Sequence, residues 1–105
     1  MAKFVYVYTG GQMNETPEAQ QQAMEAWMGW FGTLGSDVVD HGNPFGSSTT
    51  VTADGSSTGA GASALGGYSV IEAASLADAA SKAKGCPVLA GGGTVEVYEA
   101  LAIPG

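Results

Sequence analysis

The sequence predicts an α+β fold in which an antiparallel sheet carries two helices on one face. Strand-like segments occur at residues 3–8 and 94–99, and helix-like segments occur at 17–34 and 75–84. Further strand-like segments separate the two helices, so the elements follow the order βαββαβ. At 105 residues the chain has the size of one domain, and we expect residues 1–105 to form a single unit.

The first strand, at residues 3–8, is apolar on both faces. Phe4, Tyr6 and Tyr8 alternate with Val5 and Val7, and alternate residues of a strand point to opposite faces. Two helices can cover only one face of the sheet. We expect the aromatic side chains on the face that the helices leave open, and a large open apolar patch usually marks an interface. This predicts a homodimer that packs through the open face.

A long helix is predicted from about residue 17 to residue 34. Thr16 suits the N-cap and Pro17 the first helical position, while Gly35 is a typical helix end. One apolar stripe recurs at helical spacing, with Trp30 expected near its edge. The members of the stripe are Ala23, Met24, Trp27, Met28, Phe31 and Leu34.

The middle of the chain is rich in turn residues. Residues 38–41 have the character of a short strand, and residues 42–46 form a turn cluster. Residues 48–53 again have strand character, and Asp54 with Gly55 forms a turn pair. Residues 56–64 are small and polar and predict a flexible loop.

The closing segment has the clearest pattern. Residues 66–73 predict a strand and residues 75–84 a short helix, with Ser75 as N-cap and Asp78 in a capping-box-like position. Residues 85–87 end this helix. The final strand is expected at residues 94–99.

Composition and charge exclude several functions. The formal net charge is −7, and the only basic side chains are Lys3, Lys82 and Lys84. Binding to nucleic acid or to an anionic membrane surface needs clustered cations, so neither partner is expected. No apolar run is long enough to cross a membrane, and no secretory signal is visible at the N-terminus. The single cysteine suits a reducing compartment, so we expect a cytoplasmic protein.

His41 is the candidate catalytic residue, because it is the only histidine and Asp40 precedes it. A carboxylate beside an imidazole can orient it for general acid–base work. Neighbours on a strand point to opposite faces, so Asp40 is poorly placed to hold His41, and Asp37 is a second carboxylate nearby. The alternative is that His41 is an exposed or turn-capping residue beside Gly42.

Four residues are candidates for binding a ligand. Tyr6, Tyr8 and Tyr68 can supply hydroxyl groups to a cleft between the sheet and a loop, or can pack in the dimer interface. Glu72 is an acid on the same strand face as Tyr68. The aromatic and methionine side chains at residues 27–31 are core residues or line a pocket.

No metal site and no cofactor are expected. One histidine and one cysteine at distant positions do not make a metal-ligand set. Cys86 is expected to be a small buried apolar residue. The glycine clusters lack the residues of a phosphate-binding loop.

The chain resembles the YCII-related family of small proteins. The likeness is strongest at residues 66–73, with Ser75 to Ala79 and Lys84 to Pro87 after them. It extends to residues 3–8, 16–18, 40–44 and 92–97. The resemblance implies a ferredoxin-like fold that assembles as a dimeric α+β barrel.

The chain also departs from this family. The Asp-Gly-Pro-Phe segment that many relatives carry is absent at residues 58–62, and Val88 stands where some relatives have histidine. The region from residue 10 to residue 26 lacks the histidine of enzymatic relatives.

These observations leave three hypotheses. The first is a YCII-like dimer that binds a small organic molecule in a cleft beside the sheet. The second is an acid–base enzyme, such as a lyase or a dehydrohalogenase-like protein, that uses His41 with a nearby aspartate. The third is an interaction module that signals through its dimer face.

Overall fold

The structure is a computed structural model that describes residues 1–10, 16–55, 57–58 and 65–103. Within these residues the chain forms a four-stranded antiparallel sheet, a small two-stranded sheet and helices, so the predicted α+β class is confirmed. The elements are β1 (Ala2–Thr9), α1 (Pro17–Leu34), the 3₁₀ turn η1 (Gly35–Asp37), β2 (Val38–Asp40), β3 (Thr50–Val51), β4 (Ser57–Thr58), β5 (Leu65–Ala73), α2 (Leu76–Ala83), α3 (Pro87–Ala90) and β6 (Thr94–Ala100).

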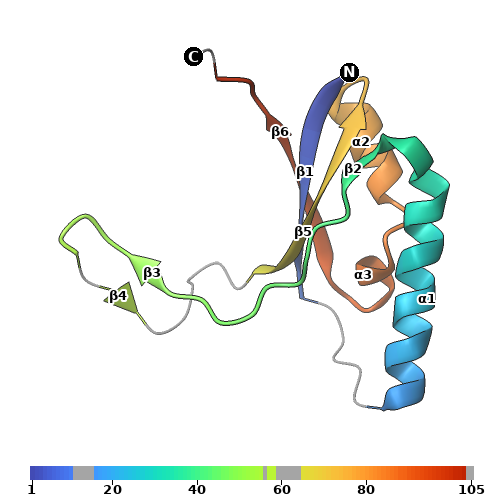
Figure 1. Cartoon of the computed structure of the whole chain (residues 1–105), viewed down its shortest axis with the longest axis horizontal. Coiled ribbons are helices and arrows are strands. Elements are labelled where there is room, and N and C mark those ends of the chain that lie inside the picture. Colours follow the sequence, from blue (N-terminus) through green and yellow to red (C-terminus); the bar gives the residue numbers. More distant parts are fainter. Residues whose placement is uncertain (11–15, 56, 59–64, 104–105) are drawn as a thin grey trace.

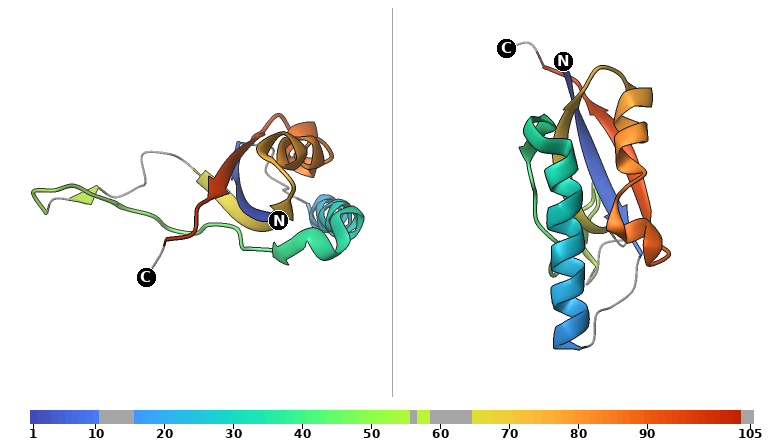
Figure 2. Two further views of the ribbon diagram at one scale, coloured as in Figure 1. Left: turned by 90° about the horizontal axis from the view of Figure 1, so that it is seen from above. Right: turned by 90° about the vertical axis from the view of Figure 1, so that its right-hand side faces the viewer.

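The main sheet has the strand order β2-β5-β1-β6, which is compatible with a ferredoxin-like arrangement. The central strand β1 pairs with β5 on one side and with β6 on the other. Both α1 and α2 lie on the same side of this sheet (Figures 1 and 2). The chain therefore has one covered sheet face and one open face.

Helix α1 begins and ends where the sequence predicts. Thr16 Oγ1 accepts a hydrogen bond from the Ala19 N–H at 3.1 Å, which satisfies one of the free donors in the first turn. Pro17 occupies the first helical position. The helix ends at Leu34, and Gly35 follows with a positive φ of 57°.

Helix α2 is also confirmed, and Ser75 is its N-cap. Ser75 Oγ accepts from the Asp78 N–H at 3.1 Å, while Asp78 Oδ2 accepts from the Ala74 N–H at 3.0 Å. Lys82 Nζ contacts this carboxylate at 3.0 Å and Asp37 Oδ2 at 3.1 Å. These ion pairs connect α2 to the turn η1. The short helix α3 was not predicted, although Pro87 at its first position is a typical helix start.

The aromatic side chains of β1 lie under the helices and not on the open face, so this prediction was wrong. Phe4, Tyr6 and Tyr8 are all buried, and the Tyr6 ring stacks on that of Trp30 with centroids 5.8 Å apart. Both faces of the strand are apolar, so alternation alone could not identify the covered face. The larger rings fill the deep space below the helices, and Val5 and Val7 lie on the other side.

The apolar stripe of α1 is centred on Trp30. Trp30 and Leu34 are buried, although Trp30 was expected near the edge of the stripe. Met24 and Met28 were expected inside the stripe, but they are 68% and 63% exposed. The helix is rotated so that Trp27, Trp30 and Leu34 point toward the sheet, and both methionines lie on its flank.

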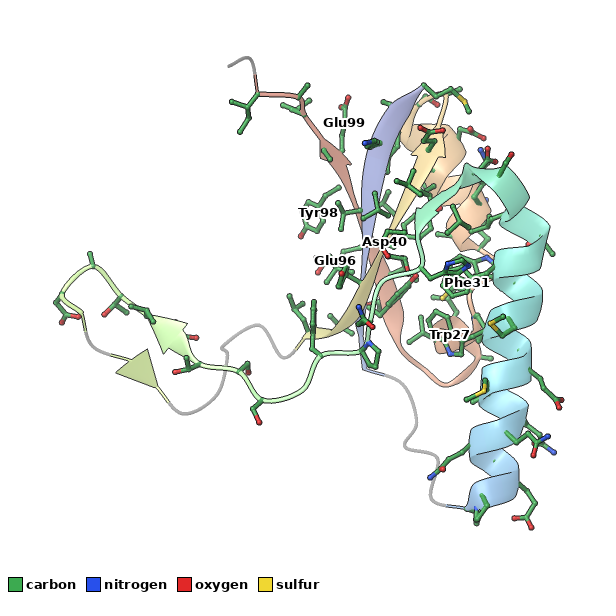
Figure 3. All side chains as sticks on the ribbon, viewed as in Figure 1. Trp27, Phe31, Asp40, Glu96, Tyr98 and Glu99 are labelled. Carbon is green, nitrogen blue, oxygen red and sulfur yellow. The ribbon has the colours of Figure 1, made fainter. Side chains whose placement is uncertain are left out.

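The open face of the sheet carries smaller apolar residues. Val7 and Val70 are half-buried there, and Tyr98 lies opposite Val5 in the register. Figure 3 shows Tyr98 and Glu96 on the side of the sheet away from Trp27 and Phe31. This face is less aromatic than the sequence suggested, and beside the valines it carries Lys3, Glu72 and Glu96.

A two-stranded arm projects from the body of the molecule (Figure 1). In the arm, β3 pairs with β4, so Thr50 lies opposite Thr58 and Val51 lies opposite Ser57. Strand β3 falls within the predicted strand at residues 48–53. The sequence predicted a loop at residues 56–64, but residues 57–58 form the strand β4. The rest of that predicted loop, at residues 56 and 59–64, lies outside the described residues, and so do residues 11–15.

Candidate functional site

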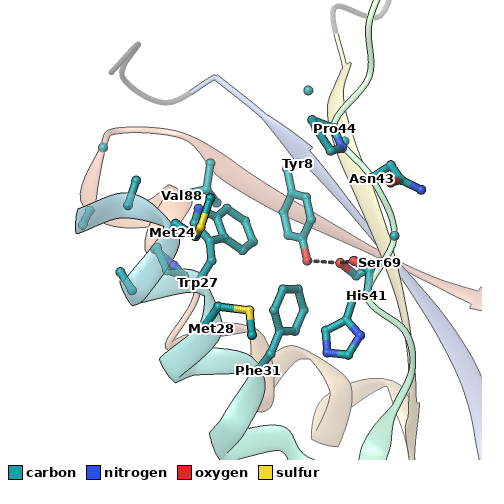
Figure 4. Close-up of a pocket in the computed structure, with 18 of the residues that line it drawn as sticks. Tyr8, Met24, Trp27, Met28, Phe31, His41, Asn43, Pro44, Ser69 and Val88 are labelled. Carbon is teal, nitrogen blue, oxygen red and sulfur yellow. Dashed lines mark hydrogen bonds between the residues drawn. The ribbon is translucent and has the colours of Figure 1, made fainter. Parts of the chain in front are cut away.

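A cavity of about 970 Å³ lies between α1, the covered face of the sheet and α3. Figure 4 shows α1 on one side of the cavity and the segment that follows β2 on the other. The described residues that line it are Tyr8, Gly10, Ala19, Gln22, Ala23, Met24, Ala26, Trp27, Met28, Phe31, His41, Gly42, Asn43, Pro44, Gly66, Gly67, Tyr68, Ser69, Pro87, Val88, Ala90 and Gly91.

The cavity exists because α1 is longer than the part of the sheet that supports it. The C-terminal half of α1 packs on the sheet through Trp30 and Leu34. Its N-terminal half extends beyond the edge of the sheet (Figures 1 and 2). Side chains on the inner surface of α1 toward that end of the sheet therefore border a hollow, and of these Trp27 and Phe31 also pack against the core.

One wall of the cavity is aromatic and thioether in character. Trp27 and Phe31 lie with ring centroids 5.9 Å apart, and the Trp27 ring meets the edge of Tyr8 at 4.9 Å. Met24 and Met28 extend the same wall along α1 (Figure 4). Thioether groups adapt to irregular surfaces and make favourable contacts with aromatic rings. This wall suits the flat, apolar part of a ligand.

The opposite wall contains a chain of hydrogen bonds. The Tyr8 hydroxyl donates to Ser69 Oγ at 2.8 Å, and Ser69 Oγ donates to the carbonyl of His41 at 2.6 Å. Ser69 is fully buried. Burial raises the pKa of the Tyr8 hydroxyl well above that of a free tyrosine, against the opposing effect of the Ser69 hydrogen bond. The hydroxyl therefore stays protonated at physiological pH, and its oxygen retains the capacity to accept a hydrogen bond.

The candidate catalytic residues are only partly brought together. His41 borders the cavity, and its ring meets the edge of Phe31 with centroids 4.8 Å apart. Asp40 Oδ1 instead accepts from the Gly42 N–H at 2.8 Å and shapes the turn. Asp37 pairs with Lys82. Among the described residues, no carboxylate forms an ion pair with the imidazole of His41.

The four candidate ligand-binding residues lie on two different faces. Tyr8 lines the cavity, and Tyr6 lies on the same covered face but donates its hydroxyl hydrogen to the Ala79 carbonyl at 2.5 Å. Burial raises the pKa of Tyr6 to about 12. Tyr68 contributes to the border of the cavity, but it pairs in register with Val7 of the open face, and its ring stacks on Phe45 with centroids 5.7 Å apart. Glu72 pairs in register with Lys3 on the open side.

The cavity carries no charged side chain among its described lining residues. Among the lining residues that the structure describes there is neither an acidic residue nor a lysine, and Lys82 is already bound to two carboxylates. Within the described ranges, no cluster of three or more histidine, cysteine or acidic side chains could hold a metal ion. Cys86 is buried away from the cavity lining, and burial raises the pKa of its thiol to about 11.

Sequence reasoning missed several residues of the site. Ser69 was read only as part of a strand, although a serine at an inward position between Gly67 and Ile71 is a polar residue in a core pattern. Val88 and Met24 reach the cavity through the position of α3 and the rotation of α1, which no local pattern signals.

Compared with known proteins, the chain matches no family model, no curated protein and no solved structure. In the described part of the chain, no helix is both long and apolar enough to span a bilayer.

Proposed function

We propose that this protein binds a small organic molecule in the cavity between α1 and the sheet. The observation that carries the proposal is the aromatic and thioether wall facing a small set of hydrogen-bonding groups across about 970 Å³. Ligand sites in proteins typically combine a mostly apolar concave surface with a few fixed polar groups. The buried Tyr8–Ser69 pair supplies such groups.

The exposure of Met24 and Met28 supports the same proposal. Two large apolar side chains, four residues apart on one flank of α1, remain mostly uncovered beside the cavity. Contiguous exposed apolar surface commonly marks a binding site. A bound molecule would remove part of this surface from water.

A fragment library screened by ligand-observed NMR and by thermal shift tests the proposal. Ala23→Phe places a ring inside the cavity, and Ala80→Phe is the matched control on the exposed side of α2. Fragments that bind the wild type and the Ala80→Phe variant should lose binding to Ala23→Phe. A library with no binders would contradict the proposal. Fragments that bind Ala23→Phe as tightly as the wild type would also contradict it.

We further infer that the chain is a YCII-like protein with a ferredoxin-like fold and that it acts as a homodimer. The strand order β2-β5-β1-β6, with two helices on one face, supports the fold. The dimer is supported by the half-buried Val7 and Val70 and by the 53% exposed Tyr98, which share the open face. A second copy would cover these side chains.

Light scattering at micromolar concentration tests the dimer. We expect the wild type to be a dimer and Val7→Lys to be a monomer with unchanged far-ultraviolet circular dichroism. The control is Val39→Lys, because Val39 lies 45% exposed on the edge strand β2. A monomeric wild type contradicts the inference.

The acid–base alternative has one supporting observation, the position of the His41 imidazole at the cavity across from Trp27 (Figure 4). Imidazole is the commonest general base near neutral pH. If the bound molecule is turned over, His41→Ala should abolish its turnover. Turnover that survives this change excludes the alternative.

A further inference from the structure

We infer that the ligand of this cavity is an uncharged aromatic alcohol or phenol, with its ring against α1 and its hydroxyl group beside Tyr8 and His41. The inference rests on the proposed function and adds the chemical class of the ligand. Three features of the cavity carry it: the aromatic wall, the state of the Tyr8 hydroxyl, and the lack of charge among the described lining residues.

The α1 wall selects a flat ring. Trp27 and Phe31 of α1 are tilted by 37° to each other, and Trp27 meets Tyr8 of the opposite wall at 78°, so rings of different orientation line the hollow. Aromatic rings prefer offset or edge-to-face partners, and such pairs stabilise more than their buried area alone predicts. The thioethers of Met24 and Met28 add sulfur–aromatic contacts. A planar aromatic group can make all of these contacts together.

The opposite wall selects a hydroxyl group. The Tyr8 hydrogen is already donated to Ser69 Oγ, so the Tyr8 oxygen is left as an acceptor. The imidazole of His41, which also borders the cavity, offers two ring nitrogens as hydrogen-bonding groups. A ligand hydroxyl both donates and accepts, so it can satisfy the Tyr8 oxygen and the imidazole together. An ether or a ketone would leave the Tyr8 acceptor without a donor.

The lack of charge in the described lining disfavours the two common alternatives. A carboxylate or phosphate would enter a cavity with no lysine in its described lining, in a chain of net charge −7. An ammonium group would find no acidic side chain in the same lining. Moving an ion out of water without a partner is strongly unfavourable. A neutral polar group avoids this cost.

Isothermal titration with three probes of one shape tests the inference: 2-naphthol, 2-naphthoate and 2-naphthylmethylamine, near neutral pH. We expect 2-naphthol to bind at least about tenfold more tightly than either charged probe. Ala23→Phe should abolish 2-naphthol binding, and Ala80→Phe should preserve it. Equal or tighter binding of a charged probe overturns the inference and leaves the proposed function intact.

Tyr8→Phe separates the hydroxyl contact from the shape of the cavity. This change should weaken the affinity for 2-naphthol by about fivefold, which is the effect of one lost hydrogen bond. The affinity for naphthalene should be unchanged. An equal loss for both probes contradicts the placement of the hydroxyl. If no naphthyl probe binds but the fragment library yields cavity binders, the inference fails and the proposed function stands. If neither yields a binder, the proposed function fails with it.

Discussion

The hydroxyl of Tyr8 and the hydroxyl of Ser69 form a buried pair 2.8 Å apart that joins the two central strands of the sheet. The Ser69 hydroxyl in turn donates a hydrogen bond to the carbonyl of His41, 28 residues earlier in the chain. One serine therefore fixes both a tyrosine in the cavity wall and the backbone of the segment that carries the imidazole. The polar side of the cavity depends on this residue.

Ser69→Ala should destabilise the protein by ~1–3 kcal/mol, because it leaves the Tyr8 hydroxyl and the His41 carbonyl without their partner. Urea denaturation followed by tryptophan fluorescence measures the change. The double variant Tyr8→Phe with Ser69→Ala should be less destabilised than the sum of the single variants, since the phenylalanine removes the orphaned hydroxyl. Strict additivity would show that the pair is not coupled.

Gly42→Ala should destabilise the protein by at least ~2 kcal/mol. Gly42 has a φ of +76°, and an added Cβ would lie 1.7 Å from the Tyr68 carbonyl oxygen, so the backbone of the turn would have to move. Gly46→Ala is the matched control, because nothing lies within 4 Å of an added Cβ there. Equal unfolding midpoints for the two variants would contradict this account of the turn.

Stability should fall as the pH rises above about 10, the pKa of an unfolded tyrosine. Burial raises the pKa of Tyr6 to about 12 and that of Tyr8 higher still. The folded state therefore retains protons that the unfolded chain loses, so each tyrosine lowers the unfolding free energy by up to about 1.4 kcal/mol per pH unit. For Tyr6, the unfolding free energy continues to fall until the pH exceeds the pKa of this tyrosine in the folded state.

Urea denaturation at several pH values between about 8 and 11 measures this slope. Tyr6→Phe should reduce the slope, and Tyr68→Phe serves as the control because the ring of Tyr68 is not fully buried. A slope that Tyr6→Phe leaves unchanged would show that Tyr6 does not contribute to it.

The thiol of Cys86 should react slowly with a disulfide reagent in the folded protein. Cys86 is only 3% exposed, and burial raises its pKa to about 11. The smaller thiolate fraction alone slows the reaction by ~100-fold relative to a free cysteine. The rate is measured at mildly alkaline pH from the absorbance of the product that the reagent releases. The same chain unfolded in guanidinium is the reference, because its one cysteine is the same thiol in an exposed state. Equal rates in the two conditions would contradict the buried position.

Local signals predicted most of the fold. Thr16 and Gly35 delimit α1, and Ser75 with Asp78 begins α2, because capping chemistry depends on near neighbours. The choice of covered face could not be predicted for β1, since both of its faces are apolar. The place of Trp30 depends on the rotation of α1, which only packing against Tyr6 decides.

The candidate site was predicted less completely. Tyr8 and His41 were named from their chemistry, and both border the cavity. Glu72 shares a strand with Ser69, but the odd spacing puts it on the opposite face. The cavity itself depends on how far α1 extends past the sheet. That distance is a property of the assembled elements, and no single segment encodes it.

The division of α1 into a sheet-facing side and a flank separates folding from selectivity. Trp30 and Leu34 anchor the helix, whereas Met24 and Met28 contribute little burial but form the wall of the hollow. Substitutions of these two methionines can therefore change what the cavity accepts without weakening the core. A protein built in this way can acquire a new ligand during evolution, or in the laboratory, by changing a few side chains on one helix.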